Sequence, residues 1–428
     1  MDGWLLKYIY LHLPAFKSRN FRLFFSGQIL SLSGTFMTQV TISWLIYNLT
    51  NSAWLLGLNG FLQFLPTLIL TPFSGVLCDR WSRRNLLMLV QILGIIVSFT
   101  LTTLTFLGFI DYRLLMIVAI LGGFLKGLDM PVRSAIVIET VDDRADLGNA
   151  IALYSAILSS SMLIGPAIGG MLLATVGAKY CFLYDSLSYI IALLTLAAMR
   201  LAPTPKSNVS YDDIWQKLQQ GFSYVYTVLP IRVILLLLAL NGLTGMSYMA
   251  LLPIFAADIL KGDGGTMGLL TAASSVGSLL ACVYLSLRRQ VLGLEPLIAL
   301  SLVIIGIGLI AFALSRELWL SVLIIVVIGG SGMLQVSGGN TIIQTLVEDD
   351  KRGRVMSFYT LAVIGMQPLG SLLAGSMAQY IGATNTIVAC GVICFAESVW
   401  FSRQLPILSD YIRSKINSTK NLSKSGVL

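Results

Sequence analysis

The chain has 428 residues, of which 56% are hydrophobic and only 11% are charged, and its mean hydropathy is +0.84. Soluble domains carry about a quarter charged residues, so this composition excludes a soluble globular protein. The formal net charge is +8, but the sequence shows no soluble basic face with interleaved aromatic residues, so we expect no nucleic-acid partner.

Twelve stretches are long and apolar enough to cross a membrane as helices, since the hydrocarbon core takes roughly 20 apolar residues. Residues 1–24 begin with a short apolar run around Trp4 that basic residues follow, which is the reverse of a cleavable signal peptide. This segment predicts a short helix on the inner membrane surface. The predicted spans are 22–47, 53–77, 85–108, 113–136, 147–173, 181–200, 231–257, 266–286, 294–314, 318–342, 355–378 and 384–402.

Lys and Arg indicate which loops stay in the cytoplasm. With an even number of spans and both ends inside, the outward-facing turns carry few basic residues, namely Arg113, Lys179, Lys261 and Arg316. We therefore expect an integral protein of the bacterial inner (cytoplasmic) membrane, in contact with membrane lipids, with both termini in the cytoplasm.

The second half of the chain matches the first after a shift of 205 positions. Gly165 aligns with Gly370, and Gly170 aligns with Gly375. A parallel duplication in one membrane is the usual origin of two bundles that rock about a shared central cavity. The sequence therefore predicts an all-α membrane protein with twelve transmembrane helices in two pseudo-symmetric six-helix bundles, and transport is the leading hypothesis.

The repeat and the composition also predict the domains. Residues 1–200 form an N-terminal bundle with its interfacial helix, and 231–404 form a C-terminal bundle. The polar segment 201–230 is a cytoplasmic linker with an amphipathic helix that Ser210 can cap. Residues 405–428 form a cytoplasmic tail, which we expect to be disordered from about Lys415 because it is rich in Lys, Ser and Asn.

The turn between the second and third spans combines small, acidic and basic residues at fixed spacing. It reads Gly75-Val76-Leu77-Cys78-Asp79-Arg80-Trp81-Ser82-Arg83-Arg84. This resembles the signature loop of the major facilitator superfamily, G-x-L-x-D-R-x-G-R-R, with Ser82 where the family usually has glycine. The resemblance implies the major facilitator fold and a gating role for Gly75, Asp79, Arg80, Arg83 and Arg84. The alternative for the arginine pair is anchoring of phospholipid headgroups.

The fifth span contains Gly165-Pro166-Ala167-Ile168-Gly169-Gly170. This resembles the core of the antiporter motif found in exporters of the same superfamily, and the resemblance favours export over import. Pro166 bends a helix and the glycines permit close helix contact, so the motif is equally compatible with packing alone.

Two stretches narrow the resemblance further. Residues 19–28 enter the first span, and Asp129-Met130-Pro131-Val132-Arg133-Ser134-Ala135 close the fourth. Both are similar to the branch that includes macrolide-efflux proteins and the enterobactin (siderophore) exporter. The resemblance extends over nearly the whole chain.

In the fourth span, Gly122, Lys126, Asp129 and Arg133 share one helix face. A charge near the membrane centre costs roughly 2.5 to 3.5 kcal/mol, so such residues usually face water, a partner or a ligand. Members of the superfamily place spans one, four, seven and ten around the cavity. Lys126 would then attract an anionic substrate and Asp129 would exchange protons. The alternative is a structural Lys126–Asp129 ion pair. We expect Arg133 in the gate, engaging Asp79.

The remaining cavity candidates are uncharged hydrogen-bonding residues, each equally suited to an interhelical bond. They are Gln28, Thr35 and Gln39 in span one, Asn241, Thr244 and Tyr248 in span seven, and Ser337 and Asn340 in span ten. Span one has no acid, so the candidates for proton coupling are Asp129, Asp185 and Glu397. Solvation at a helix end is an adequate alternative for Asp185 and Glu397.

Several other chemistries lack their residues. His12 is the only histidine and the five cysteines lack metal-like spacing, so we expect no metal and no cofactor. The phosphate-binding and catalytic motifs of ATPases, HExxH proteases and G-x-S-x-G hydrolases are missing, which disfavours an enzyme. The expected function is a monomeric secondary active transporter that exports a small amphipathic molecule, a drug or a siderophore, by proton antiport and alternating access. The alternatives are an importer or a lysophospholipid flippase on the same scaffold.

Overall fold

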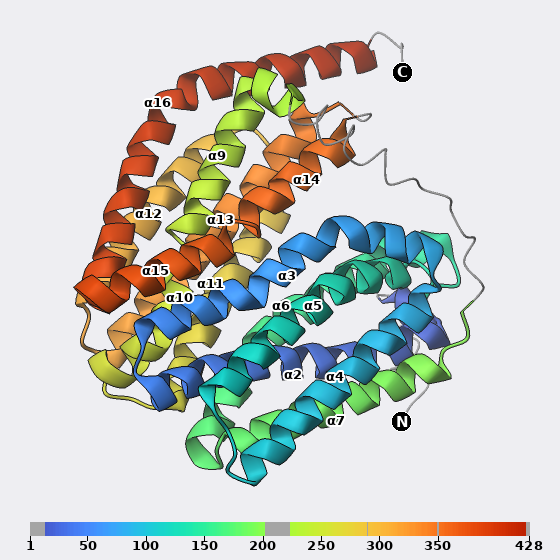
Figure 1. Cartoon of the computed structure of the whole chain (residues 1–428). Helices are drawn as coiled ribbons and strands as arrows, with labels where there is room; N and C mark the ends of the chain where they lie inside the picture. The colour runs from blue at the N-terminus through green and yellow to red at the C-terminus, as the bar shows by residue number, and fades with distance from the viewer. Residues whose placement is uncertain (1–12, 202–222, 289, 349–350, 425–428) are drawn as a thin grey trace. The chain divides into compact units, whose positions relative to one another are not determined.

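The computed structural model describes residues 13–201, 223–288, 290–348 and 351–424, with side chains described for all of these except 71–80 and 416–424. Within this part of the chain, twelve helical stretches are long and apolar enough to cross a membrane (Figure 1). The prediction of twelve spans is confirmed.

The first half of the chain supplies six of the spans. They are α2 (Arg19–Thr50), α3 (Ala53–Arg80), α4 (Arg83–Phe106), α5 (Tyr112–Val137), α6 (Leu147–Thr175) and α7 (Ala178–Ala198), with short 3-10 turns η1 (Pro14–Lys17) and η2 (Arg144–Asp146).

The second half supplies the other six, two of them built from two helices each. Its elements are α9 (Leu229–Leu243), α10 (Tyr248–Ile254), the π-helical turn η3 (Phe255–Ile259), α11 (Gly264–Leu287), α12 (Leu294–Leu314), α13 (Leu318–Leu346), α14 (Arg352–Val363), α15 (Gln367–Ile381) and α16 (Ala383–Lys424).

The chain forms two compact units. Unit 1 runs to Leu55, resumes at Leu62 for the rest of the first half, and includes Ala256–Ala272; unit 2 takes Leu56–Phe61 and the remainder of the second half. In unit 1, α2 packs against α6 and α7, and one buried cluster joins Phe24 of α2 to helices α4, α5 and α6. In unit 2, α12 packs against α13 and α16 over a second cluster of buried apolar residues.

Two spans of unit 2 are interrupted, whereas their repeat counterparts α2 and α6 are continuous. One break lies between α9 and α10, where the Met246 amide donates to the Asn241 carbonyl (3.0 Å). The other lies between α14 and α15, just before Pro368 in the first turn of α15. Interrupted helices at membrane depth are tolerated where protein or a cavity surrounds the freed backbone groups, so these breaks mark positions of interest.

Two of the segments expected from the sequence, the N-terminal surface helix and the linker, lie partly outside the described residues. Residues 1–12 of the expected surface helix lie outside the described residues, but Ala15 is fully buried on unit 1 and Ser18 donates to the Thr140 carbonyl (2.6 Å). Residues 202–222 of the linker, including its expected helix, also lie outside the described residues.

The expectation of disorder from about Lys415 is wrong, because α16 continues through Pro406 to Lys424. The part of this extension before Lys415 is held by an apolar stripe. Leu408 and Ile412 are fully buried in the core of unit 2, and Ser409 donates to Glu295 (3.0 Å).

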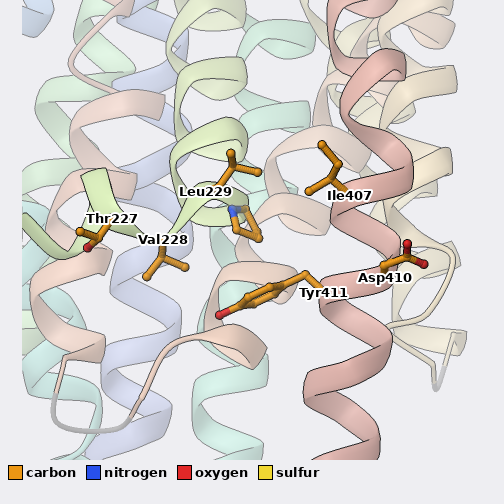
Figure 2. A pocket seen from close by; sticks show the side chains of 7 residues that line it. Thr227, Val228, Leu229, Ile407, Asp410 and Tyr411 are labelled. Atoms are coloured by element: carbon orange, nitrogen blue, oxygen red, sulfur yellow. The ribbon is translucent and has the colours of Figure 1, made fainter.

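The extension of α16 and the start of α9 also line a cavity of about 570 Å³ in unit 2, which is open at the surface. Figure 2 shows Ile407 and Tyr411 of α16 on one side, and Val228 and Leu229 on the other. The cavity lining is mainly apolar and contains none of the residues predicted to bind substrate or protons.

Candidate functional site

The charged residues of α5 form a buried pair in unit 1. Arg133 is 1% exposed, and its Nε lies 2.5 Å from Oδ2 of Asp129 one turn earlier. The Arg133 Nη2 donates to Ser31 of α2 (3.3 Å). Asp129 therefore pairs with Arg133. The Lys126–Asp129 ion pair, which was the structural alternative in the sequence analysis, is not formed. The predicted contact between Arg133 and Asp79 falls on a side chain outside the described residues.

Lys126 has a different neighbour. Its Nζ lies 4.7 Å from the centre of the Phe64 ring on α3, which is a cation–π distance. One turn earlier, a Cβ added at Gly122 would meet nothing within 4 Å, so this face of α5 is open. Among the described residues, Lys126 forms no ion pair. The ammonium therefore retains hydrogen-bonding capacity for an anion.

The uncharged candidates on α2 lie in two kinds of environment. The Thr35 hydroxyl lies 3.2 Å from that of Tyr189, and Gln39 is partly exposed. Gln28 is fully buried, and both polar atoms of its amide lack a hydrogen-bond partner within the described part of the chain.

In unit 2, Tyr248 lies in the core rather than at a surface. It is 1% exposed, its hydroxyl lies 2.9 Å from that of Ser274, and its ring packs edge-on against Phe312. Ser337 and Asn340 of α13 are both partly exposed, and Asn340 accepts a hydrogen bond from Gln344 (2.8 Å). Asn241 and Thr244 lie where α9 ends.

The two further carboxylates are buried, so solvation at a helix end does not account for them. Asp185 is 3% exposed and accepts a hydrogen bond from Ser98 (3.0 Å). Glu397 is 6% exposed, and its Oε1 lies 3.2 Å from the Thr244 hydroxyl. Each carboxylate lies inside its own unit.

The arginine pair of the signature loop caps helices within unit 1. Arg83 donates to the Ala135 carbonyl (3.3 Å) and pairs with Glu139 (3.0 Å) at the end of α5. Arg84 donates to the carbonyls of Leu196 (3.0 Å) and Ala197 (2.6 Å) at the end of α7. Cations stabilise helix C-termini, where carbonyls lack partners. The side chains of Gly75, Asp79 and Arg80 lie outside the described part of the structure.

This geometry predicts a modest stabilising role for Arg84. Arg84→Gln should lower the free energy of unfolding by roughly 0.3–1 kcal/mol, because two carbonyls of α7 lose a charged donor. Chemical denaturation of the purified protein in detergent measures the change. Arg113→Gln is the matched control, since Arg113 is exposed at the start of α5 and should leave the unfolding midpoint unchanged. Equal effects of the two substitutions would contradict the capping role.

The glycines of the antiporter-like motif bring helices of unit 1 close together. A Cβ on Gly165 would lie 2.6 Å from the Ser33 carbonyl oxygen of α2, and one on Gly169 would lie 2.7 Å from Met37. Gly170 closely approaches Gly268 of α11, in the second-half segment that belongs to unit 1. The motif residue Pro166 is buried inside α6. The motif therefore has a packing role within this unit.

Two contact partners were not identified from the sequence. For Ser98, the sequence shows only that it shares one face of an apolar span with Thr102, and not which helix that face contacts. For Phe64 there was no signal, since aromatic residues are common in these spans and only the fold brings this one to Lys126.

Comparison with known proteins identifies the family. The family model described as "Transmembrane secretion effector" matches residues 12–420. The chain is 27% identical over 383 residues to a staphyloferrin A transporter of Staphylococcus aureus, covering 88% of this chain and 95% of that protein. It is 24% identical to macrolide efflux protein A of Streptococcus pyogenes, covering 87% and 93% of the two chains. It is 22% identical to the multidrug efflux pump Tap of Mycolicibacterium fortuitum, covering 83% and 88%.

Solved structures agree on the fold. The nucleoside transporter NupG matches with a TM-score of 0.70 at 13% identity, covering 90% of this chain and 99% of that chain. A D-xylose–proton symporter matches with a TM-score of 0.67 at 16% identity, covering 92% and 97%. The predicted major facilitator fold of twelve helices in two pseudo-symmetric bundles is confirmed. The chain belongs to the transmembrane secretion effector family of the major facilitator superfamily and is an integral membrane transporter, not an enzyme.

Proposed function

We propose that this transporter exports a small amphipathic molecule that carries an anionic group, a drug or a siderophore, in exchange for protons by alternating access. It acts as a monomer in the inner membrane with both termini in the cytoplasm. Two bundles, 1–200 and 231–404, are joined by the linker 201–230, and 405–428 follow on the cytoplasmic side. The relative named as a macrolide efflux protein supports export, and the relative named as a staphyloferrin A transporter supports a siderophore as substrate.

One observation carries the substrate class. Lys126 lies near the middle of α5, over an aromatic ring and free of a carboxylate partner among the described residues. An intramembrane cation costs roughly 2.5 to 3.5 kcal/mol, of which the Phe64 ring offsets a part, so a bound anion would add further stabilisation. The adjoining open face at Gly122 leaves room for one. We assign Gln28, Thr35, Gln39, Asn241, Thr244, Tyr248, Ser337 and Asn340 as supporting hydrogen-bonding groups of the transport path.

Lys126→Gln should selectively weaken binding of anionic molecules. A charge-assisted hydrogen bond contributes about 1.5–3 kcal/mol, so the Kd of a carboxylate probe should rise at least about tenfold. Two fluorescent probes of the same skeleton, one a carboxylic acid and the other its methyl ester, separate charge from shape in titrations of the purified protein. The ester should bind the variant as it binds the unmodified protein.

Lys179→Gln provides the matched control, because the Lys179 ammonium also lies over aromatic rings, at 5.4 Å from Phe106 and 5.3 Å from Tyr180. Binding of both probes should be unaffected there. Equal losses for acid and ester in Lys126→Gln would show that Lys126 supports the helix rather than the ligand.

The direction of substrate transport and its coupling to protons are tested in vesicles. Proteoliposomes loaded with the carboxylate probe should release it faster when a proton gradient is imposed in the opposite direction, and collapse of the gradient with an uncoupler should remove the acceleration. Probe movement that ignores the gradient would reject proton antiport. Net movement in the same direction as the protons would favour import.

A further inference from the structure

Glu397 is a buried carboxylate with an incomplete hydrogen-bond set. It lies on α16 inside unit 2 with 6% exposure. Its Oε1 lies 3.2 Å from the Thr244 hydroxyl, while its Oε2 has no hydrogen-bond partner within the described part of the chain. A buried, ionised carboxylate is costly unless a cation or hydrogen bonds compensate it. The site therefore needs a positive charge from outside.

The helices around Glu397 do not provide that charge. The only charged side chain on α9 is Arg232, twelve residues before Thr244, which places it roughly 18 Å along the helix. On α12 the only one is Glu295, whose carboxylate accepts hydrogen bonds from the Gly293 amide and from Ser409. Helices α10 and α15 carry no charged residue. On α16 itself, the titratable neighbours are the thiols of Cys390 and Cys394, and the nearest cation, Arg403, lies six residues further on with an exposed side chain.

Thr244 links Glu397 to the end of α9. Its hydroxyl lies 2.9 Å from the Leu240 carbonyl oxygen, 3.2 Å from Oε1 of Glu397 and 3.4 Å from Sγ of Cys394. A hydroxyl has one hydrogen, so it donates to only one of these atoms at a time. An ionised Glu397 draws that hydrogen to itself. A protonated Glu397 donates its own proton to the Thr244 oxygen and leaves the threonine hydrogen on the Leu240 carbonyl.

The Leu240 carbonyl is part of the helix end. It accepts the Thr244 amide (2.9 Å), which is the bond at which α9 stops before the break. The next residue after Leu240, Asn241, is 2% exposed, and its Oδ1 has no hydrogen-bond partner among the described residues. An interrupted helix, two unpaired acceptor oxygens and a shared hydroxyl thus occur together.

We propose that Glu397 is the site that takes up and releases the coupling proton. Thr244 then couples the protonation state of Glu397 to the conformation of the chain at the break between α9 and α10. The proposal rests on the proposed function. Protonation forms one O–H bond on the Glu397 carboxylate, and its release returns the charge to the same oxygens. The threonine hydrogen moves between Glu397 and the Leu240 carbonyl in step, so the last turn of α9 tightens when the proton is bound.

Infrared difference spectra of the purified protein at two pH values test the site without any substrate. A protonated carboxyl group gives a C=O band that vanishes on ionisation. Glu397→Gln should remove one such pH-dependent band. Glu295→Gln is the matched control, a buried carboxylate of the same unit with both oxygens already hydrogen-bonded, and it should leave the band in place. Survival of the full band in Glu397→Gln would overturn the proposal, whatever the outcome of transport assays. Loss of the band on adding sodium at constant pH would overturn it in favour of a sodium site.

The second arm measures coupling. In vesicles loaded with the carboxylate probe, Glu397→Gln should lose acceleration by a proton gradient but keep exchange of labelled for unlabelled probe, which needs no net proton movement. Thr244→Val should also lose the acceleration by the proton gradient, whatever its effect on exchange, and Thr244→Ser should restore coupling because it keeps the hydroxyl. Thr360→Val is the control, since among the residues that the structure describes the Thr360 hydroxyl bonds only to the Met356 carbonyl of its own helix (3.0 Å). Full coupling in Glu397→Gln would reject Glu397 as the proton site but would leave the proposal of proton antiport standing. If the unmodified protein itself shows no acceleration by a proton gradient, proton antiport is rejected instead.

Discussion

Arg133→Met is expected to lower the free energy of unfolding by about 3–5 kcal/mol, the largest single effect at any position considered. The cost does not come mainly from the lost ion pair. It comes from the Asp129 carboxylate, whose Oδ2 loses its 2.5 Å partner and whose Oδ1 already lacks a partner among the described residues. Chemical unfolding in detergent, or the amount of folded protein recovered, measures the loss.

The reciprocal and double variants separate charge from packing. Asp129→Asn alone should also destabilise, because a guanidinium with 1% exposure is left without its counter-charge. Arg133→Met combined with Asp129→Leu should recover much of the stability, because replacing both partners of a buried pair by apolar residues is often neutral. Strictly additive losses in the double variant would contradict the pairing. Arg133→Lys should recover only part, since lysine cannot hold the carboxylate and Ser31 together.

A structural feature could be predicted from the sequence when it depends on residues that are close together or regularly repeated along the chain. Span number and fold class follow from runs of apolar residues and a 205-residue repeat, which are local or periodic signals. The partner of Asp129 is also a local choice, between a lysine three residues before it and an arginine four residues after it. The structural pair expected from the sequence used the lysine, whereas in the structure Asp129 pairs with the arginine.

Features that depend on neighbouring helices were out of reach. Nothing in the sequence of α7 or α16 indicates that Asp185 meets Ser98 or that Glu397 meets Thr244, because these pairs join helices more than 80 residues apart. The break between α9 and α10 could not be predicted either. The sequence offers only Gly245 there, and a single glycine is common inside continuous membrane helices. The extension of α16 was missed because its polar composition concealed an apolar stripe, of which Leu408 and Ile412 are the buried members.

The repeat itself yields the second large effect. Gly165 of α6 and Gly370 of α15 are equivalent under the 205-residue shift, and each has close backbone neighbours. A Cβ on Gly165 would lie 2.6 Å from the Ser33 carbonyl oxygen of α2; one on Gly370 would lie 2.6 Å from the Leu243 carbonyl oxygen of α9. Backbone oxygens cannot rotate away as side chains do. We therefore expect Gly165→Ala and Gly370→Ala each to lower the free energy of unfolding by about 1–3 kcal/mol, despite the better helix propensity of alanine.

The repeat also provides the controls for this prediction. Gly148 of α6 and Gly353 of α14 are equivalent under the same shift, and a Cβ on either would meet nothing within 4 Å. Gly148→Ala and Gly353→Ala should change stability by no more than about 0.5 kcal/mol. Unfolding midpoints of all four variants, measured side by side, test both halves of the molecule at once. If Gly165→Ala and Gly370→Ala unfold like the controls, close packing is not what these two positions require. If only one is destabilised, the two copies of the repeat no longer share this contact.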